Sequence, residues 1–332
     1  MITVIVPAYN AAPVLRRCLK SIREATSEQL ELIVVDDAST DATVECCEGL
    51  ADIVVRRKQR GGAAVARNEG RRHGSGDRLV FIDADVEPEP GSIDVLLTGL
   101  APGYDAAFGS YTALPPTGLR GAATRYKNFL HHFTHQRSQP EVATFWAGFG
   151  AVRAEAFDAV GGFPERAIRF ADVEDIRLGY ALTEAGHRVR VVPGAQALHH
   201  KPFTVAGLIR TDLVHRAIPW VDAALRSRSF RPELAVAPRA ILSSLAAWTA
   251  LVATMAVVVG GGWIPAAVAG LGLVAWLALN GPFLAAAYRA MGSVRQTAPL
   301  AALHVAFSWY APLGAAAGLL AHVVGRARAK RR

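Results

Sequence analysis

Short apolar runs alternate with polar stretches over the first 110 residues of the chain. Runs of three to six apolar residues are typical of buried β-strands, and the expected strands are Ile2–Val6, Leu30–Val35, Ile53–Val55 and Leu79–Ile82. Between them, helical spacing or an opening glycine pair predicts helices over Ala12–Ala25, from Ala42 onward and over Gly61–Gly74. This alternation favours an α/β fold with a mostly parallel sheet and helices on both faces.

Residues 105–230 follow a more mixed pattern. Strands are expected at Ala106–Ser110, Thr144–Val152 and Val189–Val192, and helices at Asp172–Gly186 and at Phe203–Leu225, which Pro219 interrupts. In sheets of this class, ligands bind beyond the carboxyl ends of the strands. Asp36-Asp37 and Asp83-Ala84-Asp85 directly follow two expected strands, so the predicted binding edge carries carboxylates.

The composition changes from Pro238 onward. Three runs lack Asp, Glu, Lys and Arg: Ala240–Val259, Trp263–Leu279 and Ala298–Val324. About 20 apolar residues cross a hydrocarbon core of ~30 Å. A soluble helical bundle would show polar stripes, which these runs lack, so membrane-spanning helices are favoured over buried core helices. A basic linker over residues 226–239 precedes the spanning region at 240–325, and a basic tail follows at 326–332.

The net charge of +8 belongs entirely to the last third of the chain. Residues 1–230 hold 27 basic and 27 acidic side chains, whereas residues 231–332 hold nine basic ones and a single acid. Cations that bracket apolar runs indicate a membrane partner and argue against nucleic acid. Both the linker and the tail should face the cytoplasm, but three spans would separate them, so two or three spans remain open.

The start of the sequence and the cysteines lead to an expectation about the compartment. The first residues lack the pattern of a signal peptide, and Cys18, Cys46 and Cys47 form no CxxC pair. We therefore expect no disulfide framework or structural zinc, and a multi-pass protein of the inner cell membrane whose catalytic domain lies in the reducing cytoplasm.

The acidic pairs carry the first candidate chemistry. Asp83 and Asp85 can share a hard divalent cation and a sugar hydroxyl, although a lone DxD is more often an ordinary acidic turn. Asp37 invites a ribose or base contact, while Ser39 or Thr40 of the same cluster could cap a helix. The glycine pair Gly61-Gly62 lets backbone amides approach a phosphate, or simply makes a turn.

Four motifs occur in order along the first 85 residues: Val-Pro-Ala-Tyr-Asn at 6–10, Val-Val-Asp-Asp-Ala-Ser-Thr-Asp at 34–41, Gly-Gly-Ala-Ala-Val-Ala-Arg-Asn-Glu-Gly at 61–70 and Phe-Ile-Asp-Ala-Asp at 81–85. Together they resemble the nucleotide-binding half of family 2 glycosyltransferases, which have the GT-A fold. Residues 146–153 and 157–164 resemble the acceptor-side segment of that family, and Glu174-Asp175 resembles its ED motif. The resemblance covers roughly residues 1–220, and the expected catalytic domain is 1–225.

The resemblance implies a role for each matching residue. Pro7, Ala8, Tyr9 and Asp37 would line the base and ribose of a nucleotide-sugar donor, and Arg67 would lie near the nucleotide. Asp83 would contact ribose or metal, and Asp85 would hold Mg²⁺ or Mn²⁺ on the diphosphate. Asp175 would be the general base, with Glu174 orienting it or the acceptor. Many GT-A enzymes also place a histidine near the metal; His199 is favoured for this role, but His200 is an equal rival on spacing.

The expected activity is metal-dependent, inverting transfer of a single sugar to a hydroxyl of a saccharide or lipid-linked acceptor, in the making of cell-envelope polysaccharide. Processive members of the family carry a QxxRW motif before a membrane segment, and the stretch from His215 to Trp220 lacks it. A catalytically retired membrane scaffold, or a component that handles glycolipid, is the alternative. The intact acidic clusters argue against it, as does the lack of charged residues within the apolar runs.

Overall fold

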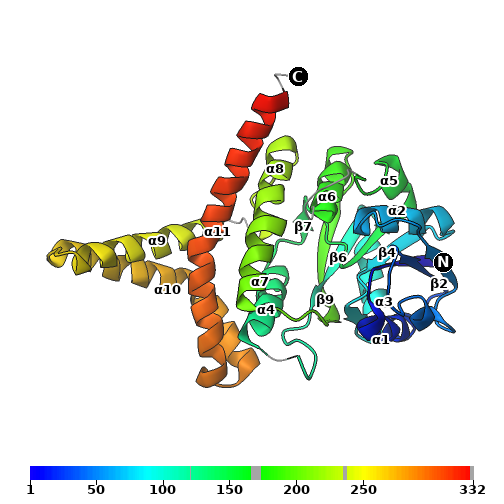
Figure 1. The fold of residues 1–332 in the computed structure, drawn as a ribbon, viewed down its shortest axis with the longest axis horizontal. Helices are drawn as coiled ribbons and strands as arrows, with labels where there is room; N and C mark the ends of the chain where they lie inside the picture. The colour runs from blue at the N-terminus through cyan, green and yellow to red at the C-terminus, as the bar shows by residue number, and fades with distance from the viewer. Residues whose placement is uncertain (120, 166–172, 235–237, 330–332) are drawn as a thin grey trace. The chain divides into compact units, whose positions relative to one another are not determined.

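The computed structural model describes residues 1–119, 121–165, 173–234 and 238–329, without the side chains of 327–329. Its contacts divide the chain into two compact units (Figure 1). The first unit comprises residues 1–119, 135–201 and 223–231, and the second comprises 120–134, 202–222 and 232–332. The second unit includes residues 120–134 and 202–222, which lie within the expected catalytic domain. The expected domain boundary at residue 225 therefore stays a prediction.

The first unit is built on a mixed sheet, to which the described residues contribute nine strands. They are β1 (Ile2–Ala8), β2 (Leu30–Asp36), β3 (Ile53–Arg56), β4 (Arg78–Ile82), β5 (Val86–Pro88), β6 (Ala106–Tyr111), β7 (Glu141–Val142), β8 (Phe149–Arg153) and β9 (Val189–His199). Their order is β3-β2-β1-β4-β8-β6-β9-β5, with β7 beside β9. The α/β class is confirmed.

Strand direction decides where the sheet carries its functional edge. β1 pairs in parallel with both β2 and β4, and β2 pairs in parallel with β3. β8 is antiparallel to both β4 and β6, and β6 is parallel to β9. Because β8 reverses direction between two neighbours, β1, β2, β4, β6 and β9 all run the same way. Their carboxyl ends therefore meet at one edge, which we call the carboxyl edge.

Helices cover both faces of the sheet. α1 (Ala12–Glu24) and α3 (Ser92–Leu97) lie on one face, and α2 (Ala63–His73), α5 (Ala154–Ala159) and α6 (Glu174–Glu184) lie on the other (Figure 1). Successive residues of β2 serve the two cores in turn: Leu32 and Val34 pack on the α1 side, while Ile33 packs with Ala66 of α2. Burial on both faces explains why the strands read as continuous apolar runs.

Four details differ from the expected elements. The helix expected from Ala42 is only a three-residue turn, η1 (Glu45–Cys47), because Asp41 accepts hydrogen bonds from the backbone amides of Ala12 and Thr43 and holds the chain in a local turn. The strand expected from Thr144 begins only at Phe149. Conversely, β9 continues from Val192 to His199, and a second short turn, η2 (Thr98–Leu100), follows α3.

Gly179 brings α6 unusually close to the preceding chain. A Cβ atom at this position would overlap the backbone nitrogen of Phe145, so the segment before β8 lies directly against the helix. Backbone cannot move aside as a flexible side chain can. The first turn of α6, which begins at Glu174, is thus positioned by a contact that requires glycine.

The second unit consists of helices. They are α4 (Ala122–Gln136, to residue 134), α7 (Val205–Arg210), the π-helical segment η3 (Thr211–Ala217), α8 (Ile218–Arg226, to residue 222), α9 (Pro238–Val258), α10 (Trp263–Met291) and α11 (Val294–Ala329). The chain from Val205 to Arg226 is continuously helical, so the interruption expected at Pro219 is wrong. Pro219 is the second residue of α8, directly after the π-helical segment, where the hydrogen-bond pattern already departs from that of an α-helix.

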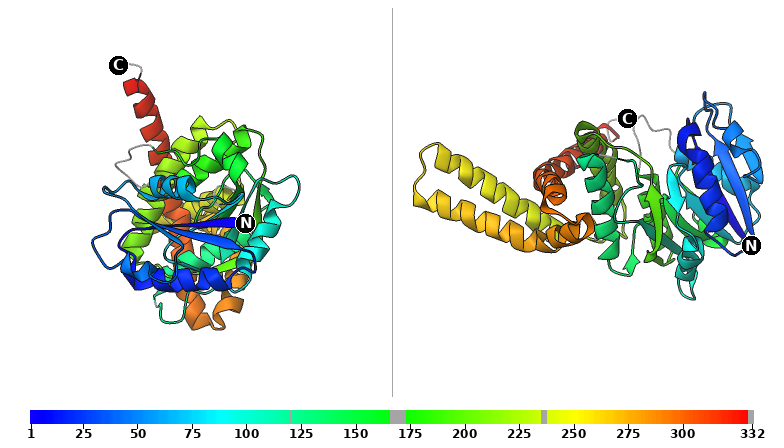
Figure 2. Two further views of the ribbon diagram at one scale, coloured as in Figure 1. Left: turned by 90° about the vertical axis from the view of Figure 1, so that its right-hand side faces the viewer. Right: turned by 90° about the horizontal axis from the view of Figure 1, so that it is seen from below.

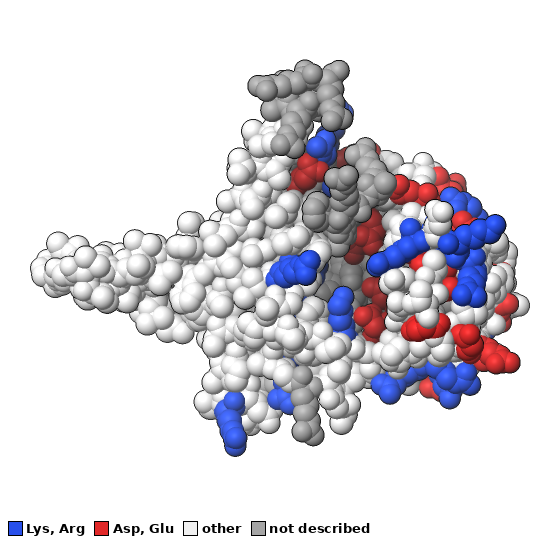
Figure 3. Space-filling model, in the orientation of Figure 1, with Lys and Arg blue, Asp and Glu red and all other residues white. Residues whose placement is uncertain are grey.

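Among the described residues, three helices are long and apolar enough to cross a membrane: Pro238–Val258, Trp263–Met291 and Val294–Arg326, with mean hydropathies of 2.0, 1.7 and 1.3. Between their ends, the visible surface of α9 and α10 carries almost no charge (Figure 3). α10 continues through Asn280-Gly281-Pro282, where the uncharged run was expected to stop at Leu279. A proline within a membrane-spanning helix is tolerated where neighbouring helices or Ser and Thr side chains satisfy the backbone groups that it frees.

Small and polar residues join these helices. α9 and α10 lie side by side (Figure 2), and a Cβ at Gly272 would come within 2.8 Å of the backbone nitrogen of Ala250. Asn280 donates to Ser243 Oγ at 2.8 Å and its Oδ1 lies 2.8 Å from His304 Nε2, which links α9, α10 and α11. Close approach and interhelical hydrogen bonds are what hold helices together where the surroundings are apolar.

Candidate active site

Residues at the ends of β1 and β2 form the first part of the carboxyl edge. Ala8 pairs with Asp36, and Asp37 donates its amide hydrogen to the Ala8 carbonyl at 2.8 Å. Pro7, Ala8 and Asp37 are therefore neighbours in the fold, and their expected role in lining a base and ribose stays a prediction. Tyr9 follows them with an exposed ring, and the Arg60 guanidinium lies 3.9 Å from the centre of that ring. Nothing in the sequence singled out Arg60.

Asp37 organises the glycine loop in this structure. Its buried carboxylate accepts hydrogen bonds from the amides of Gly61 and Gly62, the latter at 2.7 Å, and pairs with Arg57. Gly62 has a φ of 88°, a conformation that glycine adopts readily. Because both amides already donate to Asp37, they do not point at a phosphate here, and Asp37 acts as the support of the loop.

Arg67 connects two acidic motifs that lie far apart in the chain. Its side chain, 4% exposed, donates to Asp83 Oδ1 at 2.7 Å and to Glu174 Oε1 at 2.8 Å, and Glu174 is 107 residues away. Burial alone would lower the pKa of Arg67, but the two carboxylates raise it above its ordinary value. The guanidinium thus stays charged and fixes one carboxylate of each motif.

Asp85 lies beside His199. Val86 pairs with His199 across β5 and β9, and His199 Nε2 is 3.7 Å from Asp85 Oδ2. Burial raises the pKa of Asp85, while the charges of Lys201 and His200 act in the opposite direction. The His199 ring stacks on Tyr111, with ring centres 4.4 Å apart.

Two aromatic side chains border this pair. Tyr111 ends β6, and its ring meets Trp146 edge to face at 4.8 Å. Trp146 belongs to the segment that resembles the acceptor side of the family and directly precedes β8. Asp83 donates its amide hydrogen to the Gly148 carbonyl, which holds this segment at the carboxyl edge. Sequence reasoning did not select Tyr111; its place at the end of a strand was the one available signal.

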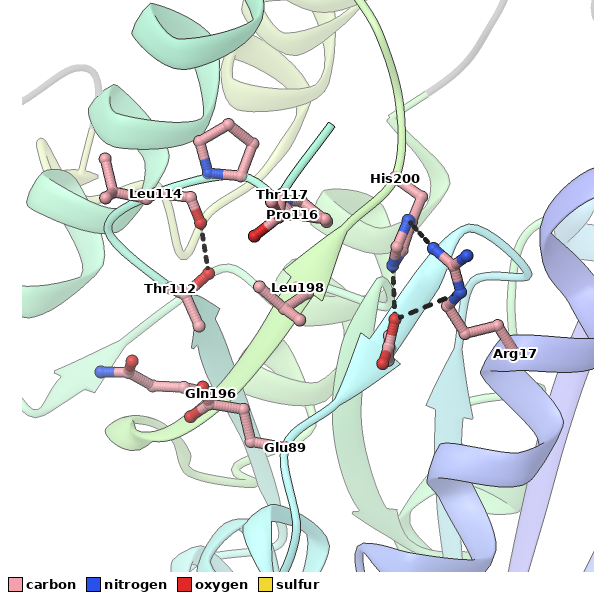
Figure 4. A pocket seen from close by; sticks show the side chains of 11 residues that line it. Arg17, Glu89, Thr112, Leu114, Pro116, Thr117, Gln196, Leu198 and His200 are labelled. Atoms are coloured by element: carbon pink, nitrogen blue, oxygen red, sulfur yellow. Dashed lines mark hydrogen bonds and ion pairs between the residues drawn. The ribbon is translucent and has the colours of Figure 1, made fainter. Parts of the chain in front are cut away.

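His200 points to the opposite side of β9. Its Nε2 lies 2.6 Å from Glu87 and its Nδ1 lies 3.1 Å from Arg17. Together with Leu198 and Gln196 it lines a cavity of about 630 Å³, and Figure 4 shows His200 and Arg17 at one end of it. The two histidines differ in where their rings lie: the His199 imidazole faces the Asp85 carboxylate, whereas the His200 imidazole contacts Glu87 and Arg17. The backbone amide of His200 nevertheless donates to the Asp85 carbonyl at 2.8 Å.

Glu174 and Asp175 form the first turn of α6. Glu174 is held by Arg67, and Asp175 is half-buried with its Oδ1 accepting from the Ile176 amide at 2.8 Å. Carboxylates at this position suit the positive end of the helix dipole. Residues 166–172, just before α6, lie outside the described part of the chain, and so does the expected start of this helix at Asp172.

A divalent cation fits the Asp85–His199 pair by donor chemistry. A carboxylate oxygen and an imidazole nitrogen are ligands for Mn²⁺, and Mg²⁺ favours oxygen donors and phosphate oxygens. No group of three or more His, Cys, Asp or Glu side chains in the described part of the chain is arranged around a common metal position. The remaining coordination positions would have to come from substrate or water.

A mixed sheet whose aligned carboxyl ends carry these acids is the arrangement expected of the GT-A fold, and the structural comparison supports this fold. The structure superposes on a mannosyltransferase from Pyrobaculum calidifontis, solved in complex with GDP-Man and Mn²⁺, with a TM-score of 0.57 and 22% identity over 97% of this chain and 86% of that one. Residues 3–161, just under half of the chain, match the glycosyl transferase family 2 model, and this part of the chain is a family 2 glycosyltransferase segment.

Curated relatives are also glycosyltransferases. Glycosyltransferase AglE of Haloferax volcanii is 30% identical over 198 residues, which cover 55% of this chain and 64% of AglE. The N-acetylglucosaminyl-diphospho-decaprenol L-rhamnosyltransferase of Mycobacterium tuberculosis is 28% identical over 236 residues, 60% of this chain and 76% of that protein. Glycosyltransferase GlyA of Streptococcus pneumoniae is 36% identical over 115 residues, but only 16% of its length is matched.

Proposed function

We propose that this protein transfers a single sugar from a nucleoside diphosphate sugar to an acceptor hydroxyl, with inversion at the anomeric carbon and with the help of a divalent cation. The observation that carries the proposal is the contact of Arg67 with both Asp83 and Glu174. Group transfer requires the donor site and the acceptor base to meet in one place. Arg67 contacts Asp83 of the motif expected to bind the donor and Glu174 of the motif expected to supply the base.

The nucleoside would bind at the ends of β1 and β2. Pro7, Ala8 and Tyr9 would line the base and ribose, over the loop that Asp37 supports. The exposed ring of Tyr9, with Arg60 against it, offers a flat surface for a base. The GDP-Man bound by the mannosyltransferase of similar fold supports a nucleotide-sugar donor.

Asp85 and His199 would hold Mg²⁺ or Mn²⁺, and Asp83 would contact the ribose or the same cation. The Mn²⁺ in the neighbouring mannosyltransferase structure supports a divalent ion. When bound, the cation neutralises negative charge on the departing diphosphate. Asp83 is kept in place by Arg67, so its carboxylate is oriented before the donor arrives.

Asp175 would act as the general base, with Glu174 fixed beside it by Arg67. The acceptor oxygen forms a bond to the anomeric carbon while the bond from that carbon to the diphosphate oxygen breaks. The hydroxyl proton passes to the Asp175 carboxylate, and the nucleoside diphosphate leaves with the bonding electron pair. Attack from the side opposite the leaving group inverts the anomeric configuration.

The acceptor would be a saccharide or a lipid-linked saccharide at the cytoplasmic face of the inner membrane. The name of the decaprenol-dependent relative and the three apolar helices support a lipid-linked acceptor. In this proposal residues 1–225 form the transferase domain and residues 240–325 anchor it through two or three spans. Donors of this kind are cytosolic, so the catalytic domain would face the cytosol.

The test is a screen of nucleotide sugars with the purified full-length protein, measuring nucleoside diphosphate release with Mn²⁺ or Mg²⁺ and after chelation. Asp85→Asn and Asp175→Asn should each lower turnover about 100-fold or more, the scale of losing a catalytic polar group. Asp158→Asn is the matched control, because Asp158 forms an exposed pair with Arg71 on the outside of α2. Full turnover by both site variants would refute the proposal.

A further inference from the structure

A second cavity lies within the helical unit, at the turn between two helices able to cross a membrane. It measures about 380 Å³ and is lined by the start of α4 and by the α10–α11 turn. The lining residues are Gly121, Ala122, Arg125, Ser293, Arg295, Gln296, Pro299 and Leu300. We call it the turn pocket. It contains none of the residues assigned to the transfer reaction.

The turn pocket carries two positive charges and no negative one. Arg125 donates to Gln296 Oε1 at 3.4 Å, and Arg295 is exposed. Within the described residues, neither arginine has a carboxylate at ion-pairing distance. Arginine that is not engaged by a carboxylate presents a planar fork of donors, which matches the oxygens of a phosphate group.

Two helices also begin at this pocket. α4 starts at Ala122 and α11 starts at Val294, and Ser293 accepts from the Gln296 amide in the first turn of α11. The first amides of a helix are not used within the helix, and the helix dipole favours an anion there. The two arginines and the two helix starts therefore all favour a negatively charged ligand.

The pocket lining also includes apolar side chains. Pro299, which is exposed, and the buried Leu300 belong to it together with the two arginines. The turn itself, Gly292-Ser293, separates two helices whose length and composition suit membrane crossing. If α10 and α11 cross, this turn lies at a membrane surface, where anionic lipid headgroups are concentrated and attract basic segments. A lining that combines two cations with apolar side chains suits an amphiphile better than a free ion.

We propose that the turn pocket binds the phosphate group of an anionic membrane lipid. Arg125 and Arg295 contact the phosphate oxygens, and Pro299 and Leu300 contact the first part of the acyl region. The inference depends on the membrane position of α10 and α11 and does not depend on the transfer reaction. It gives α4 a role of its own, since this helix supplies one of the two arginines.

The experiment measures lipid binding to the full-length protein in nonionic detergent by native mass spectrometry. The probes are short-chain phosphatidylglycerol, short-chain phosphatidylcholine and inorganic phosphate. We expect saturable binding of phosphatidylglycerol, about tenfold weaker in Arg125→Gln and in Arg295→Gln, the scale of one lost charged hydrogen bond. Arg125→Lys, which keeps the charge without the fork, should lose less. Arg289→Gln is the matched control, because Arg289 lies exposed near the same turn but outside the pocket lining.

Three outcomes would overturn the assignment. Equal weakening by Arg289→Gln would mean that the lipid responds only to the general charge of the turn. Competition by inorganic phosphate at the same concentration as the lipid would make a soluble phosphate the occupant. Equal binding of phosphatidylcholine, or no saturable binding by the unsubstituted protein, would remove the anionic lipid altogether.

Discussion

Removing the Arg67 guanidinium should destabilise the first unit far more than removing the guanidinium of Arg71, which lies on the same helix. Arg67 makes two charged hydrogen bonds, at 2.7 and 2.8 Å, and each such bond contributes about 1.5–3 kcal/mol. Asp83 and Glu174 are 37% and 19% exposed, so water can take over part of the lost contact. We therefore expect Arg67→Met to cost about 2–4 kcal/mol, below the full value for a buried pair.

Arg71→Met provides the comparison. Arg71 pairs with Asp158, which is 50% exposed, and an exposed pair contributes below about 1 kcal/mol. The assay is urea unfolding of the full-length protein in detergent, followed by tryptophan fluorescence, with the m-value checked between variants. Equal midpoints for Arg67→Met and Arg71→Met would refute the reasoning.

A double-mutant cycle tests whether Arg67 joins the two motifs as a unit. Asp83→Asn and Glu174→Gln each leave Arg67 one charged partner, whereas the double variant leaves a buried cation with none. The double variant should therefore cost more than the sum of the single ones, by about 0.5–3 kcal/mol. Strict additivity would mean that the two carboxylates act independently and that Arg67 does not couple them.

Three further predictions concern other parts of the molecule. His199→Ala should raise the Mn²⁺ concentration needed for half-maximal turnover at least tenfold, as measured by metal titration, while His200→Ala should change this concentration less than twofold. The reverse order would contradict the assignment. Gly179→Ala should cost about 1–3 kcal/mol or more, since the new methyl meets backbone, and an unchanged unfolding midpoint would rule out that close approach. Gly272→Leu should lower the melting temperature in detergent by several degrees, whereas Gly270→Leu, with open space around it, should not, and equal effects would contradict the α9–α10 contact.

Local patterns in the sequence were sufficient to predict most strands of the first unit. β1, β2 and β4 bury both faces, so each appears as an unbroken apolar run with sharp ends. The direction of β8 was not predictable, because an apolar run reads the same whichever way it pairs. Its reversal, together with the antiparallel pairing of β5 and β7 with β9, makes the sheet a mixed one.

The site was predictable where it depends on strand ends and not where it depends on side chains meeting across the fold. Asp37 and Asp83 were found because each follows an apolar run. The link from Arg67 to Glu174 spans 107 residues, and no local pattern records such a contact. The sequence also suggested that the glycine loop could meet a phosphate, but its amides bind Asp37 instead, a competition that only packing reveals.

The register of β5 on β9 has a consequence for how this site can change over evolution. Neighbouring residues of a strand face opposite sides, so pairing of Val86 with His199 directs that imidazole toward Asp85 and leaves the next one against Glu87 and Arg17. Deleting one residue from the segment at Pro193-Gly194 and letting β9 slide would bring His200 to the position of His199 and Lys201 to that of His200. Insertions and deletions there should therefore be tolerated only where one compensates the other, whereas changes of identity at those two positions leave the alignment of the imidazoles intact.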